Sequence, residues 1–324
     1  MIRIGIVGGA GYTAGELCRI LLNHPEAEIV FINSESNAGN LVTDVHSGLL
    51  GETDLRFTSE LPLDSGEVDV LFFCFGHGKS TQFLTDNYVP ADVRIIDLAQ
   101  DFRLAAEDND YVYGLPELNR QHICGAAHVA NPGCYATCIQ LGLLPLAKAG
   151  LLQGDISVNA ITGSTGAGVR PTPGTHFSWR TGNISIYRAF EHQHVPEILQ
   201  SLHQLQPDFD GAVEFIPYRG DYPRGIFATE VVRCDASEED IAALYRDFYS
   251  DAPFTHYVDR PIDMKQVVNT NKCIIHAERH ADKLLITACI DNLLKGASGQ
   301  AVQNMNLMFG LEETTGLRLK ALAF

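Results

Sequence analysis

Residues 2–17, with the sequence IRIGIVGGAGYTAGEL, join a short apolar run to a glycine-rich turn. The apolar run is typical of a buried β-strand, and the following LCRILLNHP repeats leucine and isoleucine at helical spacing. A glycine-rich turn between a strand and a helix lets the backbone approach a pyrophosphate group, while the helix N-terminus supplies aligned N–H donors. The stretch therefore predicts a strand, a turn and a helix that bind a dinucleotide.

The glycine turn alone is a weak signal, because similar glycines occur in tight strand-to-helix turns that bind nothing. Its spacing is also imperfect, since position 14 is Ala14. The βαβ context at the start of the chain favours cofactor binding over the plain turn. We predict that Gly8, Gly11, Tyr12 and Thr13 contact the cofactor.

Three further apolar runs follow, at 28–36, 68–76 and 93–99. They read as strands that are buried on both faces of a sheet, and helical segments alternate with them. This alternation predicts an α/β fold with a Rossmann-type, doubly wound parallel sheet.

The end of the second run, Ser34-Glu35-Ser36, is where the cofactor's ribose is expected. The hydroxyl groups of Ser34 and Ser36 favour the 2'-phosphate of NADP. The carboxylate of Glu35 favours the two free hydroxyls of NAD instead. We predict NADP, with NAD as the open alternative.

The pattern changes after about residue 150, where β-rich runs are separated by longer connections. The runs are DISVNAITGST, AVEFIPYR, IFATEVVRC, CIIHAER and KLLITACI. They predict an α+β domain with a mixed or antiparallel sheet. We place a cofactor-binding domain at 1–133, completed by a C-terminal helix at 298–324, and a catalytic domain at 134–297.

Composition excludes some classes of partner. The chain has 324 residues, a formal net charge of -17 and a pI near 5.0, so its field repels nucleic acid and anionic membranes. No signal peptide and no apolar stretch of membrane-spanning length is evident. The eight cysteines form no CxxC pair and fit reduced thiols. We expect a soluble, cytoplasmic protein.

The stretch NPGCYATC, residues 131–138, places Cys134 directly after a Pro-Gly break. The break should put Cys134 in the first turn of the next helix, where the dipole and the unpaired N–H groups favour a thiolate. A nucleophilic cysteine needs this environment. The alternative is a small buried side chain, which is the commoner fate of a cysteine.

A thiolate that attacks an acyl group needs a proton carrier, and YRAFEHQHVPEI offers His192 and His194. In an extended segment these residues share a face, and Pro196 and Glu197 read as the first turn of a helix. The pair could instead be half of a metal site or two surface histidines. We see no third and fourth ligand at a recognisable spacing, so we predict no metal.

Arginines lie in loops marked by glycine or proline, where a guanidinium can bind carboxylate or phosphate at two points. They are Arg103, Arg170, Arg219 and Arg224. A single arginine of this kind is more often a solvated charge, so only the four together indicate a binding site.

The motifs GGAGYTAGEL, NPGCYAT, HQHVPEI, PRGI and DNLLKGASGQAVQ occur in this order across nearly the whole chain. Together they resemble the N-acetyl-gamma-glutamyl-phosphate reductase family, which is similar to aspartate-semialdehyde dehydrogenase. The combination of PGCY with HxHxPEI is far more specific than the glycine turn.

The resemblance implies an enzyme of arginine biosynthesis that uses NADPH to reduce an N-acyl-gamma-glutamyl phosphate to the semialdehyde with release of phosphate. It implies that Cys134 forms a thioacyl intermediate, that His194 or His192 shuttles the proton, and that Glu197 orients the histidines. Which acyl group the substrate carries stays open.

The resemblance assigns further positions. It implies that Gly166 and Asn292 contact the cofactor, and that Arg103, Ser164 and Arg224 bind the substrate. It also implies a homo-oligomer, a dimer or tetramer formed through the sheet of the second domain.

Three alternatives remain. The nearest is another phosphorylating semialdehyde dehydrogenase of the aspartate-semialdehyde type. The second is a nucleotide-sensing regulator that keeps the Rossmann half without chemistry, although such a sensor would not need Cys134 and both histidines. The third is a metal-dependent hydrolase.

Overall fold

The computed structural model describes residues 1–63, 66–76 and 78–322. The chain divides into two compact units. The first unit comprises Met1–Pro132 and Ala297–Arg318, and the second comprises Gly133–Gly296 and the residues from Leu319 onward.

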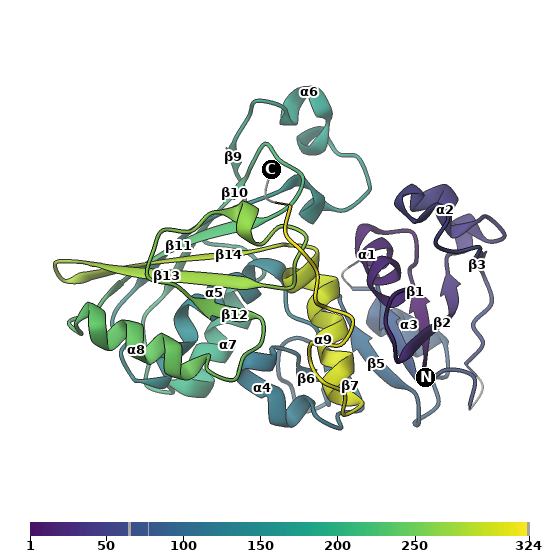
Figure 1. Cartoon of the computed structure of the whole chain (residues 1–324), viewed down its shortest axis with the longest axis horizontal. Helices are drawn as coiled ribbons and strands as arrows, with labels where there is room; N and C mark the ends of the chain where they lie inside the picture. Colours follow the sequence, from purple (N-terminus) through teal and green to yellow (C-terminus); the bar gives the residue numbers. More distant parts are fainter. Residues whose placement is uncertain (64–65, 77, 323–324) are drawn as a thin grey trace. The chain divides into compact units, whose positions relative to one another are not determined.

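The first unit contains a seven-stranded sheet in the order β3-β2-β1-β4-β5-β7-β6 (Figure 1). Its strands are β1 (Ile2–Val7), β2 (Ala27–Asn33), β3 (Phe57–Thr58), β4 (Val70–Phe73), β5 (Arg94–Asp97), β6 (Val112–Tyr113) and β7 (His128–Ala130). All their pairings are parallel, which confirms the predicted doubly wound sheet. The chain leaves β1 towards β2 on one side and later returns to β4 on the other, so the topological switch lies between β1 and β4.

The sheet of the first unit is buried because its strands are almost continuously apolar. Val7, Phe31, Leu71, Phe73 and Ile95 form one cluster in this core. Helices of the unit are α1 (Tyr12–Leu21), α2 (Val42–Val45), α3 (Ser80–Asp86), α4 (Pro116–Ile123) and α9 (Gly299–Met308).

The helix predicted over 298–324 is much shorter than expected. Helix α9 ends at Met308, and Gly310 has a φ of 69°, a left-handed conformation that terminates helices. Residues from Leu319 onward cluster with the second unit, where Lys320 accepts a hydrogen bond from the Asn269 side chain through its carbonyl (3.0 Å).

The second unit contains a mixed seven-stranded sheet in the order β12-β13-β14-β11-β8-β10-β9, as the sequence predicts. Its strands are β8 (Ile156–Thr162), β9 (Ser185–Ile186), β10 (Val213–Arg219), β11 (Ile226–Arg233), β12 (Thr255–Tyr257), β13 (Cys273–His280) and β14 (Lys283–Ile290). Helices of the unit are α5 (Cys134–Lys148), α6 (Phe177–Arg180), α7 (Val195–Leu205) and α8 (Glu238–Phe248). Helices α5, α7 and α8 pack on one face of this sheet (Figure 1).

Helix α5 is buried along most of its length, because every side chain from Tyr135 to Ala147 is buried. Pro145 lies inside it and has no N–H to donate to the carbonyl of Leu141, four residues earlier. The Tyr249 hydroxyl, which follows α8, donates to that carbonyl instead (2.5 Å). The hydroxyl of Tyr249 therefore connects α8 to α5 at the Leu141 carbonyl, which lacks a helical donor because of Pro145.

The substitution Tyr249→Phe should lower the free energy of unfolding by about 1–2 kcal/mol, because the buried Leu141 carbonyl would lose its donor. Urea denaturation of the parent and the variant measures the change. Tyr88→Phe is the matched control, since Tyr88 is 82% exposed. Equal stability of the parent and the Tyr249 variant would contradict the assigned role.

Candidate active site

Cys134 is the first residue of α5, as the Pro-Gly break predicts. The N-cap, Gly133, is extended (φ -67°, ψ 149°), and its carbonyl accepts the first helical hydrogen bond, from the Thr137 N–H (2.8 Å). The first-turn N–H groups have no partner further back in the helix, so they and the helix dipole favour a negative charge at this position. Cys134 is partly exposed, in contrast to the buried Cys138 one turn later.

The backbone around Cys134 has no space for extra side-chain atoms. A Cβ atom at Gly133 would lie 2.2 Å from Nε2 of His194. A Cβ atom at Gly296 would lie 2.8 Å from Cβ of Cys134. The imidazole of His194 therefore lies directly against the residue that precedes the cysteine, and both glycines are required for this close approach.

Glu197 joins the same cluster from the first turn of α7 and is only 2% exposed. Its Oε2 accepts a hydrogen bond from the Gly133 N–H (3.0 Å), and its Oε1 lies 4.0 Å from Nε2 of His194. The structure thus brings three predicted residues, Cys134, His194 and Glu197, together around one backbone turn.

The segment that carries His192 and His194 is a turn, which corrects the predicted extended conformation. His194 is in the helical region (φ -85°, ψ -12°), and its N–H donates to Nδ1 of His192 (3.2 Å). The two rings still meet, with centroids 4.6 Å apart. The hydrogen bond within the turn brings the two imidazoles together, whereas the prediction relied on strand alternation to place them on one face.

His192 is 7% exposed and lies among aromatic rings. Burial lowers its pKa from 6.5 to about 4, and the guanidinium groups of Arg188 and Arg219 act in the same direction. His192 is therefore neutral at neutral pH.

Tyr135 belongs to the site although the sequence did not single it out. Its ring packs edge-on against His192 and His194, and its hydroxyl donates to the Tyr218 carbonyl (2.9 Å). The signal that could have found it is its place directly after Cys134, on the buried side of the helix start.

Gly166 and Asn292 were both predicted to contact the cofactor, and the structure brings them together. A Cβ atom at Gly166 would lie 3.9 Å from Nδ2 of Asn292. Asn292 donates to the Thr165 hydroxyl (3.0 Å) and accepts from the Gly225 N–H (2.7 Å). Ser164 is adjacent and donates its N–H to the Tyr222 carbonyl (2.8 Å).

Each of the two predicted substrate-binding arginines is oriented by polar contacts with residues of its own unit. In the first unit, Arg103 is buried and donates to the carbonyls of Leu98 and Asn131 (both 2.9 Å). In the second unit, Arg224 pairs with the fully buried Asp291, with Nε 3.1 Å from Oδ2. Asp291 could not be predicted as the partner of Arg224 from the sequence, because 67 residues separate the two.

The glycine turn of the first unit has the geometry of a pyrophosphate site. Gly8 has a φ of 84°, and a Cβ atom there would lie 2.8 Å from the carbonyl oxygen of Cys74. Among the described residues, and apart from the neighbours of Gly11 in the chain, no heavy atom lies within 4 Å of a Cβ atom built on Gly11, the N-cap of α1. Tyr12 and Thr13 are the first residues of that ten-residue helix. This turn fits the phosphates of a dinucleotide, with the helix N-terminus supplying the donors.

At the end of β2, Ser34 is buried and Ser36 is exposed. The side-chain amide of Asn37 donates to both hydroxyls (3.1 Å each), while Glu35 is exposed. The hydroxyls are therefore oriented by a common amide at the strand end where a ribose is expected.

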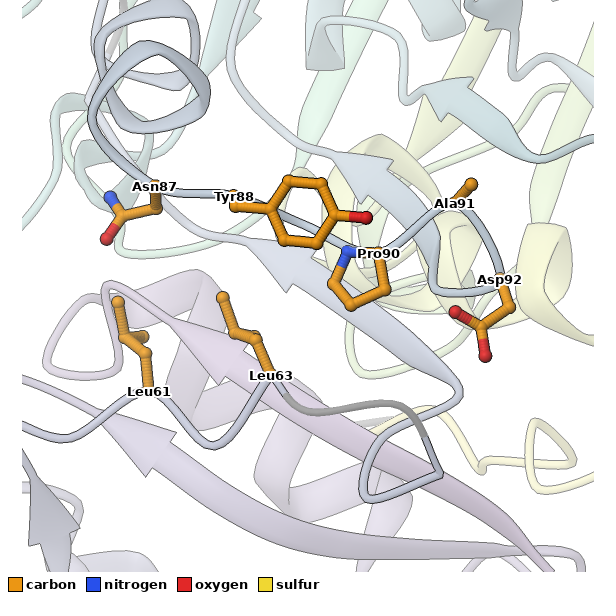
Figure 2. Close-up of a pocket in the computed structure, with 7 residues that line it drawn as sticks. All are labelled: Leu61, Leu63, Asn87, Tyr88, Pro90, Ala91 and Asp92. Carbon is orange, nitrogen blue, oxygen red and sulfur yellow. The ribbon is translucent and has the colours of Figure 1, made fainter.

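A hollow of about 680 Å³ in the first unit lies elsewhere (Figure 2). Leu61 and Leu63 line it from the segment before β4. The connection between α3 and β5 contributes Asn87, Tyr88, Pro90, Ala91 and Asp92. These residues precede strands β4 and β5, whereas Gly8 follows β1. The hollow is therefore at the N-terminal ends of the parallel strands, and the glycine turn is at their C-terminal ends.

Over residues 1–63, 66–76 and 78–322, no group of three or more histidine, cysteine, aspartate or glutamate side chains is arranged to bind a metal ion. In the same described part of the chain, no helix has the length and apolar character needed to cross a membrane.

Comparison with known proteins identifies relatives over the whole chain. Residues 3–126 match the family model "Semialdehyde dehydrogenase, NAD binding domain", and residues 134–292 match "Semialdehyde dehydrogenase, dimerisation domain". An N-acetyl-gamma-glutamyl-phosphate reductase of Bacteroides thetaiotaomicron is 68% identical over 100% of both chains. The proteins of the same name from Parabacteroides distasonis and Flavobacterium johnsoniae are 62% and 55% identical, each over 100% of both chains.

Solved structures share the fold at low identity. Aspartate semialdehyde dehydrogenase II of Vibrio cholerae, complexed with ASA, has a TM-score of 0.74 at 17% identity and covers 96% of this chain and 98% of its own. The aspartate semialdehyde dehydrogenase of Candida albicans, solved with NADP, has a TM-score of 0.72 at 15% identity and covers 95% of this chain and 98% of its own. Taken with the full-length relatives and the cluster around Cys134, these matches show that the chain belongs to the semialdehyde dehydrogenase family, in its N-acetyl-gamma-glutamyl-phosphate reductase branch.

Proposed function

We propose that the protein reduces an N-acyl-gamma-glutamyl phosphate to the N-acyl-glutamate semialdehyde with NADPH and releases phosphate, as a step of arginine biosynthesis. The observation that carries the proposal is the cluster at the start of α5. There a partly exposed cysteine at a helix N-terminus lies beside a histidine and a carboxylate that contact the preceding residue. An acyl phosphate reductase needs such a nucleophile, with a proton carrier beside it.

Cys134 acts as the nucleophile. Its thiolate attacks the acyl carbonyl, the carbon–oxygen bond to phosphate breaks, and phosphate leaves with the electron pair of that bond. The product is a thioester on Cys134. The N–H groups of the first turn of α5 are donors suited to the oxyanion that develops on the carbonyl oxygen.

NADPH, when bound, would supply a hydride to the thioester carbon. A proton donated to the carbonyl oxygen would complete the thiohemiacetal on Cys134. Breaking the carbon–sulfur bond then forms the aldehyde and restores the thiolate of Cys134. The proton that the oxygen gains on reduction is lost again in this collapse, so one residue has to donate it in the first step and take it back in the second.

His194 is the better candidate for this proton, because it lies against Gly133 and has the Glu197 carboxylate near its ring. His192 stays neutral at neutral pH and accepts the His194 N–H through Nδ1. We therefore assign His194 as the acid–base residue and His192 as the residue that positions it. Glu197 orients the pair through its bond to the Gly133 backbone.

The glycine turn at Gly8 and Gly11 and the helix start at Tyr12 and Thr13 would hold the pyrophosphate of NADPH. Ser34 and Ser36 would bind its 2'-phosphate, and Gly166 with Asn292 would lie near the nicotinamide. For the substrate, we propose Ser164, Arg103 and Arg224. Each guanidinium already has a fixed orientation, which reduces the entropy lost on binding a carboxylate or phosphate.

The protein is further proposed to be a cytoplasmic homo-oligomer that acts on a small molecule. The match to a family dimerisation domain at 134–292 supports the oligomer. Helices cover one face of the second sheet, while residues on its other face, such as Ile216 and Val231, are partly exposed. That face is the proposed contact with a second copy.

Iodoacetamide at pH 7 should alkylate Cys134 at least about tenfold faster than Cys124, although Cys124 is the exposed thiol. The reason is that the thiolate, favoured at the helix N-terminus, is the reactive form. Peptide mapping by mass spectrometry measures both rates. Burial raises the pKa of Cys74 well above its usual range, so that thiol should stay unmodified. Faster labelling of Cys124 would contradict the assignment of the nucleophile.

In the reverse direction, the enzyme should reduce NADP when given N-acyl-glutamate semialdehyde and phosphate. Cys134→Ser should lower kcat at least about 1,000-fold and His194→Gln by about 100-fold or more, whereas His192→Gln should cost about tenfold or less. NADP binding to each variant is the control. A panel of acetyl, succinyl and beta-aspartyl substrates defines the acyl specificity. Normal turnover by Cys134→Ser would overturn the mechanism.

The buried, neutral His192 should make stability depend on pH. Between pH 6.5 and about 4, His192 is protonated in the unfolded chain but not in the folded chain. The stability that the neutral His192 contributes is therefore complete above pH 6.5 and is lost as the pH falls. From pH 7 to 4.5 the parent should lose about 2–3 kcal/mol of unfolding free energy relative to His192→Gln. Urea denaturation of both proteins at the two pH values measures this loss. An equal loss of unfolding free energy in the parent and in His192→Gln would contradict the prediction.

A further inference from the structure

Arg219 is the last residue of β10, in the second unit, and its side chain is partly exposed. Among the described residues, no carboxylate pairs with its guanidinium and no group accepts a hydrogen bond from it. Arg224 of the same unit differs, because the buried Asp291 neutralises it. A partly buried charge without a partner is costly, so the unpaired guanidinium of Arg219 indicates a binding site for an anion.

The guanidinium is nevertheless held in place. Cζ of Arg219 lies over the ring of Tyr187, 3.9 Å from the ring centroid. A Cβ atom at Gly174 would lie 3.8 Å from Nη1, so the connection after β8, which also carries the predicted substrate residue Ser164, passes beside the guanidinium. The contact with Tyr187 engages the face of the guanidinium and leaves the N–H donors at its edge available to bind a carboxylate at two points.

Tyr187 also contacts the residues of the proposed catalytic cluster. Its ring lies 5.7 Å from that of His192, centroid to centroid, and its hydroxyl interacts with the hydroxyl of Tyr135. Burial raises the pKa of the Tyr187 phenol to about 12, and the negative charge of the Cys134 thiolate acts in the same direction. Arg219 is therefore connected through one tyrosine to the surroundings of the nucleophile.

The backbone of β10 leads to the same place. The carbonyl of Tyr218, the residue before Arg219, accepts the hydrogen bond from the Tyr135 hydroxyl (2.9 Å). Burial lowers the pKa of His192, and the positive charge of Arg219 contributes to this shift. An anion bound by Arg219 is therefore close enough to belong to a substrate that reacts at Cys134.

The substrate of the proposed reductase carries carboxylates besides its acyl phosphate. Every N-acyl-glutamyl substrate has an α-carboxylate, and an acyl group derived from a dicarboxylic acid, such as succinyl, ends in a second one. These groups do not react, so the enzyme has to bind them apart from the carbonyl that Cys134 attacks.

We propose that Arg219 binds a carboxylate of the substrate that does not react, while Tyr187 holds the guanidinium in position. The proposal rests on the proposed function and adds a specificity residue to that site. The ligand is a carboxylate in either case, and the experiment distinguishes the α-carboxylate from the terminal carboxylate of the acyl group.

Protection of Cys134 from iodoacetamide tests the proposal without turnover. The probes are N-acetylglutamate and N-succinylglutamate, which lack the reactive phosphate, together with the α-amide of N-acetylglutamate. The acid that Arg219 binds should slow alkylation of the parent. Arg219→Gln should need at least about 20-fold more of it for half-maximal protection, because a charge-assisted, two-point contact is lost. Arg219→Lys should lie between the two, since it keeps the charge without the two-point geometry.

Arg233→Gln is the matched control, because Arg233 is exposed at the end of β11 in the same unit. It should be protected as well as the parent is. Binding of NADP to each variant checks that the variant is folded.

The pattern of protection identifies the carboxylate. If Arg219 binds the α-carboxylate, Arg219→Gln weakens protection by both acids, and the α-amide protects the parent as poorly as N-acetylglutamate protects the variant. If Arg219 binds the terminal carboxylate of the acyl group, Arg219→Gln weakens protection by N-succinylglutamate alone. Either pattern supports the proposal.

The reverse assay separates this role from phosphate binding and from a merely structural one. Arg219→Gln should raise the KM for the semialdehyde that carries the bound carboxylate at least about 20-fold. The KM for phosphate and kcat should stay within about threefold of the parent values, because the reacting groups are not touched.

The proposal is overturned if no probe protects the parent, if every probe protects Arg219→Gln as well as the parent, or if the KM for phosphate rises in place of the KM for the semialdehyde. A parent that the probes protect but that does not reduce NADP would contradict the proposed reductase reaction and leave the role of Arg219 standing.

Discussion

The close approach of three backbone segments at Cys134 is the constraint on which the site depends. Gly133 lies against the imidazole of His194, and Gly296 lies against Cβ of Cys134, at distances that exclude any side chain on either glycine. Residues far apart in the chain therefore converge on Cys134 and the residue before it. Glu197 completes the arrangement, because its carboxylate accepts the Gly133 N–H and thereby fixes the start of α7, directly after the two histidines, to the start of α5.

Helix α5 carries this arrangement, and the second unit is built around it. Tyr245 and Tyr249 donate to the carbonyls of Gly142 and Leu141, which connects α8 to α5 one turn before Pro145. Gly142 also accommodates Glu230 of β11, since a Cβ atom there would lie 2.2 Å from Oε2. Burial raises the pKa of Glu230 well above its usual range, so it is a neutral acid against the helix. These contacts hold the helix at fixed points of its backbone, which suits a helix that has to position a nucleophile at its first residue.

Much of this could be predicted from local sequence. Apolar runs and the glycine turn predicted the parallel sheet, because buried parallel strands leave a continuous hydrophobic pattern, and the Pro-Gly break predicted that a helix begins at Cys134. Prediction was wrong at two places where the local backbone departs from the periodic pattern. The His192–His194 segment is a turn, because His192 accepts a backbone hydrogen bond that no periodicity encodes. The C-terminal helix ends at Met308, well before the end of the helical pattern that we extended to residue 324.

Local patterns in the sequence were sufficient to predict most of the order of strands and helices, the glycine turn at a helix start and a cysteine at the start of α5, because each depends on residues within a few positions of one another. The environments of the proposed site residues became visible only in the folded chain. It showed that His192 is buried and neutral, that His194 faces the nucleophile's backbone and that Arg224 is held by Asp291. Burial and contacts between segments separated by 60 or more residues set these properties, and spacing along the chain does not specify them.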